Sequence, residues 1–431
     1  MTDVDFDVIV VGAGVAGSVA AYQLANAGHE VLLIDRGAEI GSKNLSGGIF
    51  YSRVMEQVFP DFLDEAPVER HITRNVISFL NASSRVNIDY WDERLADPVN
   101  AVSVLRAKLD PWLAEQCEEA GVTVLPGIKV DELMIENGAV VGVRADEDEL
   151  RAHIVIAADG VNSFLAQYAG IRAKEPTKHL ALGVKSVVEL GEEKIQDRFN
   201  VRGNEGVAYA IVGDATQGVA GGGFLYTNRD TVSIGVVLRL DDLAAKGLVA
   251  SDVHDHFLAH PAIAPLLEGG ELLEYGCHLT IEDGPAMTSH DLTRPGLLII
   301  GDAGGFTLNT GLTIRGMDLA AGSALAAVAA AHSALEAGDF SQEAMDKYLA
   351  ELDNSFVGQD MKTYKKAPAF LETQEMYGEM GDLLADVFYN LYNLDTTPRK
   401  PLIRAAQDAL KASGMKMTKL ARIALGAIRS L

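Results

Sequence analysis

The sequence predicts an α/β fold: a Rossmann-like domain with a parallel sheet, an inserted antiparallel β-sheet (α+β) domain, and a helical C-terminal region. Three observations support this. Short apolar runs rich in Val and Ile recur near residues 8, 155 and 298, as is typical of buried parallel strands. Strand-like stretches alternate with Gly-rich turns from about 183 to 280. Beyond Phe340 the pattern is mostly helical.

Composition excludes several classes of protein. A chain of 431 residues, 48% hydrophobic and 23% charged, can bury a large core in more than one domain. Its 36 Lys and Arg against 61 Asp and Glu give a net charge of −25, which disfavours nucleic acid as a partner. The two cysteines, Cys117 and Cys277, are too few for a disulfide scaffold or a four-thiolate metal site, so no metal site is expected.

The same reasoning predicts a cytoplasmic chain. The N-terminus is acidic, and the apolar run that follows stops at Gly12, unlike a secretory signal. No apolar run reaches the roughly 18 to 20 residues of a membrane-spanning helix. The nearest, residues 319–331, is Ala-rich and is expected to be a buried helix.

The first 35 residues form a predicted βαβ unit. A strand over 7–11 leads into GAGVAG at 12–17, a helix over 18–26 and a second strand over 30–34. In this context Gly12 permits a tight turn, Gly14 allows a pyrophosphate to approach the backbone, and Gly17 lets helix and strand pack. Asp35 stands where a carboxylate accepts hydrogen bonds from both ribose hydroxyls, and it disfavours a 2′-phosphate. The unit therefore predicts a site for NAD or FAD.

Later elements favour FAD. We expect a helix over 106–121, a strand over 122–125, a hairpin over 133–143 around Asn137-Gly138, and a strand over 154–158 before Asp159-Gly160. A strand over 297–300 then precedes Gly301-Asp302 and a long helix from about 312 to 337. In a nicotinamide dehydrogenase the glycine-rich dinucleotide-binding domain and the substrate domain usually follow one another in the sequence. Here β/α elements of the first domain recur near residues 155 and 298. Asp302 is either a helix N-cap or a carboxylate bonded to the ribityl chain of FAD.

Five strings carry a family resemblance: VVGAGVAG at 10–17, GSKNLSGG at 41–48, AADGVNS at 157–163, GDAGG at 301–305 with RGMD at 315–318, and FVGQDMKTY at 356–364. The chain resembles, over nearly its whole length, flavoproteins of the glutathione-reductase-type FAD fold. Within that fold it is similar to the FixC-type members of the electron-transfer-flavoprotein:quinone oxidoreductase family. The second and fifth strings are the most particular to this branch.

The resemblance implies a set of FAD-binding residues. The pyrophosphate would contact Gly12, Gly14, Gly17 and Arg106; the adenosine, Asp35 and Arg36; the isoalloxazine, Lys43, Asn44 and Gly48; the ribityl chain, Asp302; and the flavin N1/O2 edge, the backbone amides of Gly311, Leu312 and Thr313. Asp159, in the third string, is added to the cofactor site. The alternatives are a solvated loop lysine for Lys43 and a surface ion pair at a helix start for Arg106.

The sequence also predicts domain limits. The FAD-binding domain would comprise residues 1–75, 101–170 and 286–345. The substrate or quinone domain would comprise 76–100 and 171–285. The C-terminal helical region would cover 346–431.

The implied function is electron transfer by FAD from an electron-transfer flavoprotein of α and β subunits to quinone, within an electron-bifurcating complex. Because no cysteine follows Cys277, a small ferredoxin-like iron–sulfur subunit would carry the cluster that longer relatives hold themselves. No residue is assigned an acid–base catalytic role. Phe164-Leu165-Ala166 stand where monooxygenase relatives usually have an arginine, which argues against a hydroxylase. Two alternatives are a geranylgeranyl-reductase-like enzyme that saturates isoprenoid double bonds and a non-catalytic flavin-bearing subunit.

The C-terminal tail, 411–431, has five basic residues and no acidic one. Apolar residues recur with helical spacing at Leu420, Ile423, Ala424, Ala427, Ile428 and Leu431. We therefore expect a basic amphipathic helix that rests on a membrane, on an acidic partner or on the protein's own surface. A peripheral position on the cytoplasmic face of the cell membrane is the expected location.

Overall fold

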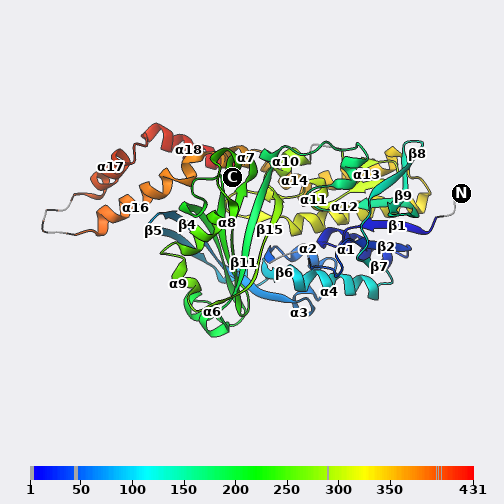
Figure 1. The fold of residues 1–431 in the computed structure, drawn as a ribbon, viewed down its shortest axis with the longest axis horizontal. Coiled ribbons are helices and arrows are strands. Elements are labelled where there is room, and N and C mark those ends of the chain that lie inside the picture. The colour runs from blue at the N-terminus through cyan, green and yellow to red at the C-terminus, as the bar shows by residue number, and fades with distance from the viewer. Residues whose placement is uncertain (1–3, 43–46, 289–290, 395, 397, 399) are drawn as a thin grey trace.

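The computed structural model describes residues 4–42, 47–288, 291–394, 396, 398 and 400–431. The molecule is elongated, and three parts follow one another along its length (Figure 1). The sheet that contains the N-terminal strand lies at one end, a second sheet lies in the middle, and the helices α16 (Glu379–Tyr392) and α17 (Leu402–Ala412) lie at the other end.

The first sheet joins segments that are far apart in the sequence. Its strands run in the order β16-β17-β10-β1-β2-β7. The bounds are β1 (Phe6–Val11), β2 (Val31–Asp35), β7 (Thr123–Pro126), β10 (Asp148–Ala157), β16 (Thr293–Arg294) and β17 (Leu297–Ile299). All neighbours are parallel except β16 and β17. Val10, flanked by Leu33 and Ile156, is fully buried, which explains the apolar runs near 8, 155 and 298.

A hairpin extends this sheet at β10. Strands β8 (Glu132–Glu136) and β9 (Ala139–Ala145) pair antiparallel, and β9 also pairs with β10. The turn residues Asn137 and Gly138 have φ of 51° and 84°, as a type I′ turn requires. The predicted hairpin is confirmed.

Helices α1 (Val15–Asn26), α4 (Arg106–Glu119) and α12 (Met317–Ala337) belong to the same domain, and α1 packs against both others. Small buried side chains such as Ala20, Ala21 and Ala327 allow close approach of the helices. Among the described residues α12 alone is long and apolar enough to cross a membrane, but 67% of its most apolar window is buried inside the protein. It is a core helix, as the Ala-rich run predicts.

The second sheet has the order β15-β11-β14-β13-β12-β4-β6-β3, with β5 beside β4. The bounds are β3 (Gly47–Phe50), β4 (Val68–Asn81), β5 (Ser84–Trp91), β6 (Val102–Leu105), β11 (Leu180–Glu189), β12 (Glu205–Gly213), β13 (Gly221–Thr227), β14 (Thr231–Arg239) and β15 (Glu271–Ile281). The antiparallel prediction holds except between β12 and β4, which are parallel. Residues 68–75 and 102–105, grouped with the first domain on sequence grounds, pair into this sheet.

A buried arginine fixes one end of this sheet. Arg70 on β4 is 1% exposed and donates hydrogen bonds to the carbonyl oxygens of Asn228, Gly203, Glu205 and Arg229. It therefore ties the loop after β13 to the segment before β12.

The remaining helices are short or C-terminal. They are α2 (Arg53–Glu56), α3 (Phe62–Glu65), α5 (Phe164–Tyr168), α6 (Glu192–Phe199), α7 (Leu240–Lys246), α8 (Ala250–Ala259), α9 (Ala264–Leu267), α10 (Gly284–Met287), α11 (Gly301–Gly304), α13 (Gln342–Asn354), α14 (Phe356–Thr363), α15 (Ala367–Leu371) and α18 (Met417–Ser430). A two-residue hairpin, β18 (Leu308–Asn309) with β19 (Ile314–Arg315), precedes α12.

The predicted tail helix is confirmed over Met417–Ser430 but not for the residues before it. Helix α17 ends at Ala412, and Gly414 has φ of 70° between the two helices. Helix α18 returns from the far end towards the middle of the molecule (Figure 1). Its Ile423 packs with Phe370 and Leu371.

Candidate functional site

A cavity of about 580 Å³ lies between the two sheets. One wall comprises loops that follow β1, β2, β10 and β17, the carboxyl ends of the parallel strands. The facing wall comprises residues of β11, β13, β14 and β15. The volume is typical of a small-molecule site, and the carboxyl edge of a parallel sheet is where such folds bind ligands.

The glycine turn closes this edge as the fingerprint predicts. Gly12 has φ of 107°, and a Cβ there would lie 2.3 Å from the Ala158 carbonyl oxygen. At Gly17 a Cβ would lie 1.9 Å from the Gly12 carbonyl oxygen. Gly14 is different, because a Cβ there would meet only the Arg106 guanidinium, at 3.4 Å. Only Gly12 and Gly17 are therefore required by the packing of the protein itself.

Helix α1 begins at this turn with free donors. Gly14 is its N-cap, no side chain caps it, and its first turn has no acidic residue. The N-terminal amides and the helix dipole therefore present positive potential to the cavity. An anionic group such as a pyrophosphate fits this end.

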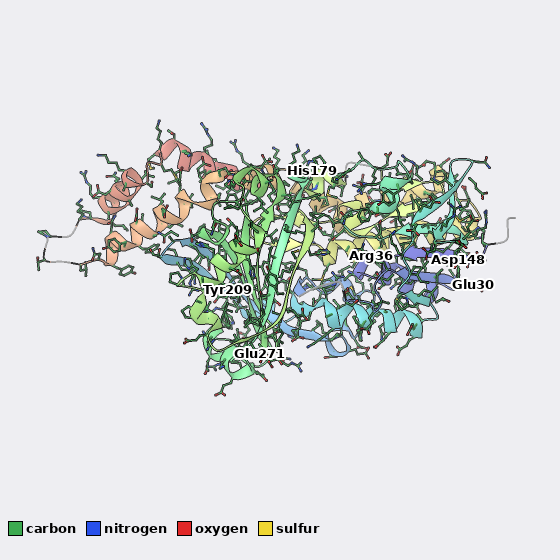
Figure 2. All side chains as sticks on the ribbon, in the orientation of Figure 1. Glu30, Arg36, Asp148, His179, Tyr209 and Glu271 are labelled. Carbon is green, nitrogen blue, oxygen red and sulfur yellow. The ribbon has the colours of Figure 1, made fainter. Side chains whose placement is uncertain are left out.

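Asp35 lies beside the glycine turn at the end of β2. Its Oδ2 accepts a hydrogen bond from the Ala13 amide at 3.0 Å, and its Oδ1 accepts one from the Gly37 amide at 2.6 Å. Each carboxylate oxygen can accept a further bond, so the group can hold a diol as well. Arg36 follows it at the end of β2 that faces the second sheet, whereas Glu30, before the strand, lies at the outer end of the molecule (Figure 2).

Arg106 forms an ion pair at the start of α4, but not at the surface as the alternative interpretation has it. Its Nε and Nη2 atoms donate to the carboxylate of Asp110 at 2.6 and 2.7 Å, within α4. The pair is not on the surface, because Asp110 is fully buried and Arg106 lines the cavity opposite Gly14.

Two enclosed carboxyls face the cavity with few donors. Asp159 Oδ2 accepts from the Leu165 amide at 3.1 Å, while its buried Oδ1 has no hydrogen-bond partner in the described chain. Asp302 has a long bond, 3.4 Å, from Thr307 Oγ1. Burial raises the pKa of both carboxyls, although Arg106 opposes the shift at Asp302. The N-cap alternative for Asp302 is wrong, because Ile300 is the N-cap of α11. A ligand with hydroxyl groups would satisfy these oxygens.

Some predicted residues lie elsewhere. Lys43 and Asn44 are outside the described residues, while Gly48 on β3 lines the cavity. Residues 311–313 form the turn of the β18–β19 hairpin and are not part of the cavity wall. The Gly311 amide donates to Asn309 Oδ1 and the Thr313 amide to Thr310 Oγ1.

The long helix expected from about 312 begins instead at Met317, because the hairpin occupies the preceding residues. Gly316 and Met317, at the true helix start, line the cavity. The helix N-terminus at the cavity wall therefore lies about five residues later in the chain than predicted.

The second sheet contributes residues that the sequence did not single out. Lys185 on β11 and His278 on β15 come from paired strands and line the cavity. Burial and the neighbouring Arg106 lower the pKa of Lys185 to about 8. Burial, Lys185, Arg106 and Arg36 lower the pKa of His278 to about 4. A single lysine in the apolar strand LALGVKSVVE was the signal that could have indicated this wall.

Aromatic and acidic groups complete the facing wall. Phe224 and Tyr226 on β13 stack with their ring centroids 5.0 Å apart. Glu282, just after β15, is 5% exposed and lines the same cavity. Within the described residues, no cluster of three or more His, Cys, Asp or Glu side chains could hold a metal ion.

Comparison with known proteins agrees with this geometry. Residues 5–221 match the family model described as an FAD binding domain. The chain is 44% identical over 416 residues to a probable electron transfer flavoprotein-quinone oxidoreductase, YdiS, of Escherichia coli K12, covering 96% of this chain and 97% of that protein. It is 42% identical over 412 residues to the protein FixC of Salmonella typhi, covering 94% and 96%.

Solved structures share the fold at lower identity. A geranylgeranyl bacteriochlorophyll reductase-like protein of Thermoplasma acidophilum has a TM-score of 0.72 at 21% identity, over 97% of this chain and 99% of that one. The halogenase PltM, solved with FAD, has a TM-score of 0.61 at 14% identity, over 98% and 85%. At these identities the likeness shows the fold alone.

The cofactor is FAD, and the site fits it. The uncapped α1 N-terminus suits a pyrophosphate, the Asp35 carboxylate suits a ribose, and the poorly satisfied Asp159 and Asp302 carboxyls suit further hydroxyls. The cavity continues from these groups to the aromatic residues of the second sheet. An elongated flavin nucleotide would thus contact both domains.

Proposed function

Because this chain belongs to the family of FixC proteins and electron-transfer-flavoprotein:quinone oxidoreductases, which are FAD-dependent oxidoreductases, we propose that it takes electrons from an electron-transfer flavoprotein and passes them to quinone. The observation that carries this proposal is a continuous cavity whose wall includes both the groups that suit FAD and the stacked rings of Phe224 and Tyr226. A flat, partly apolar acceptor ring suits such a wall.

The cofactor supplies the redox chemistry, and the protein supplies binding, orientation and electrostatics. The glycine turn and the α1 N-terminus hold the anionic centre of the dinucleotide. Arg106, kept in place by Asp110, adds positive charge beside Gly14. Lys185 is a further cation on the opposite wall, and it favours negative charge that develops in the cavity on reduction.

We propose that the physiological assembly contains the α and β subunits of an electron-transfer flavoprotein and a small ferredoxin-like iron–sulfur subunit. The cysteine content supports a separate iron–sulfur subunit. Cys117 is buried in the first domain and Cys277 lies on β15, so this chain cannot ligate a four-cysteine cluster. In an electron-bifurcating complex of this kind, the bifurcating flavin would belong to the partner.

A peripheral position on the cytoplasmic face of the membrane is also proposed. Part of the tail rests on the protein's own surface, because Lys419 pairs with Glu375 and Glu379 and Ile423 is buried. The other face of α18 exposes Leu425 and Ile428, at 52% and 80%. Exposed Arg422 and Arg429 flank these residues. Apolar side chains beside cations suit an anionic lipid surface.

An anaerobic stopped-flow experiment tests the proposed function. The purified holoprotein is mixed first with reduced electron-transfer flavoprotein and then with a short-chain ubiquinone or menaquinone analogue. We expect the flavin absorbance to bleach and then to recover with one quinol formed per flavin. Bleaching followed by stoichiometric saturation of a prenyl chain, with no quinol, would instead support the isoprenoid reductase.

A further inference from the structure

Glu282 is a buried carboxyl on the wall of the flavin cavity. It follows the last residue of β15, and its amide donates to the His179 carbonyl oxygen at 2.8 Å, which fixes the backbone. The side chain is 5% exposed and shares the cavity wall with Asn309, Thr307 and Val237. It is therefore a buried acid, on a hydrogen-bonded backbone, at the site where the acceptor is proposed to bind.

The surroundings favour the protonated form of this carboxyl. Asn309 contacts its side chain: Asn309 Nδ2 donates to Glu282 Oε2 at 3.5 Å, the limit of a hydrogen bond. An ionised carboxylate with so little compensation is costly to bury. Burial disfavours the charged form most, the Asn309 hydrogen bond and Arg239 favour it, and Asp283 and Asp241 add to the effect of burial. Burial raises the pKa of Glu282 to about 7.

Two of the charged groups that act on Glu282, Arg239 and Asp241, belong to an ion-pair network. Arg239, at the end of β14, pairs with Asp241 at 2.7 Å and with Glu372 at 3.3 Å. These two carboxylates are 34% and 56% exposed. The charge of Glu282 also affects Tyr377, which is buried. The carboxyl thus lies on the cavity wall and within electrostatic reach of a charged network that water reaches.

We infer that Glu282 is the group that delivers protons from this surface network to the acceptor in the cavity. The inference rests on the proposed function, because quinone reduction consumes protons. Two electrons from the electron-transfer flavoprotein and two protons convert the quinone to its hydroquinone. For each proton passed by Glu282, its O–H bond breaks and an O–H bond forms on a quinone oxygen. Water at the surface network then returns a proton to the carboxylate.

His278, Tyr226 and the two aspartates on the cavity wall suit this step less well. The low pKa of His278 leaves it without a proton to donate at neutral pH. Burial raises the pKa of Tyr226 far above neutrality, so it holds its proton. Asp159 and Asp302 lie on the cofactor side, among the groups that suit FAD hydroxyls.

Three variants of the holoprotein test the inference. Glu282→Gln keeps the shape and removes the acid, and Glu282→Asp keeps an acid. The matched control is Glu69→Gln, because Glu69 is also buried, at 6%, but pairs with Lys108 and lies off the cavity. FAD content and melting temperature are measured for each, so that an unfolded variant is recognised.

The kinetic readout is the reoxidation of the dithionite-reduced holoprotein by a short-chain quinone between pH 5 and 9. Wild type and Glu69→Gln should slow as pH rises through about 7, the pKa of Glu282. Glu282→Gln should be slower by about 100-fold at pH 6 and should lose the decrease in rate centred near pH 7, and Glu282→Asp should recover part of the rate and of that pH dependence. A wild-type rate and pH profile in a folded, FAD-loaded Glu282→Gln would overturn the inference.

An infrared difference spectrum between oxidised and reduced holoprotein separates this inference from the proposed function, since it needs no quinone. A protonated-carboxyl band should be present in wild type and Glu69→Gln, shifted in Glu282→Asp and absent in Glu282→Gln. Persistence of the band in Glu282→Gln would refute the assignment. A wild type that shows the band but is not oxidised by quinones would refute the proposed function and still support Glu282 as the redox-linked acid.

Discussion

Replacing Gly14 by alanine should separate cofactor binding from folding. The backbone at Gly14 has φ of −82° and ψ of −177°, which any residue adopts. The added Cβ would meet only the Arg106 guanidinium, at 3.4 Å, and would otherwise point into the cavity. The apoprotein should thus be unchanged or more stable by about 0.4–1 kcal/mol, because alanine restricts the unfolded chain.

The same methyl group should weaken FAD binding. It occupies the place where the pyrophosphate approaches the backbone, and losing one charge-assisted hydrogen bond costs about 1.5–3 kcal/mol. Since about 1.4 kcal/mol corresponds to a factor of ten, the dissociation constant should rise by about 10- to 100-fold. Fluorescence titration of apoprotein with FAD measures this, and thermal unfolding of the apoprotein measures stability.

Gly17→Ala is the matched control. Its Cβ would lie 1.9 Å from the Gly12 carbonyl oxygen, so it should destabilise the apoprotein itself. An unchanged FAD affinity in Gly14→Ala would refute the placement of the pyrophosphate at this turn. A Gly14→Ala apoprotein as unstable as Gly17→Ala would show that the fold, rather than the ligand, requires Gly14.

Four further predictions follow from the structure. Asp35→Ala removes the carboxylate that accepts from Ala13 and Gly37, and it should weaken FAD binding by about 100-fold or more; unchanged flavin content would refute the ribose role. Lys185→Met removes a buried cation. Because the pKa of Lys185 is about 8 in the folded protein and 10.5 in the unfolded chain, its charge should destabilise the wild type below pH 8, and this destabilisation should disappear as pH rises towards 10.5. A difference in melting temperature between wild type and Lys185→Met that is the same at pH 7 and at pH 10 would contradict this. Arg70→Met leaves four carbonyl groups without their donor and should lower the free energy of unfolding by about 3–5 kcal/mol in denaturant unfolding. A decrease below about 1 kcal/mol would show that these hydrogen bonds do not stabilise the sheet. Charge reversal at Arg422 and Arg429 should reduce flotation with anionic vesicles by at least about tenfold, whereas reversal at exposed Lys174 and Lys178 should not; equal losses would remove the tail as the membrane contact.

The first sheet could be predicted well from the sequence, because its apolar runs and turn residues have the structures that such local patterns usually have. The Val- and Ile-rich runs around Val10, Ile156 and Leu298 are neighbours in one sheet, and the Asn137-Gly138 turn has the positive φ values that it implies. The glycine pattern also predicted correctly that Gly12 is needed for a tight turn and Gly17 for close packing of helix and strand. These features depend on residues close in sequence or on burial on both faces.

The second sheet and the hairpin before α12 depend on long-range contacts that periodicity does not reveal. The parallel pairing of β12 with β4 joins residues more than a hundred positions apart. The start of α12 at Met317 is set by the β18–β19 pairing, which competes with helix formation over 308–315. Lys185, His278 and Glu282 meet the cofactor side of the cavity only through this tertiary arrangement, so no spacing in the sequence marks them.

Hydrogen exchange of the apoprotein with and without FAD tests most directly whether one FAD occupies the cavity between the two sheets. FAD at saturation should slow exchange both in the glycine turn over 12–17 and in the facing strand end around 277–282. The exposed strand β5 (Ser84–Trp91) lies away from the cavity and should not change. Protection of the glycine turn without protection of residues 277–282, or a protein that binds no FAD, would contradict the account.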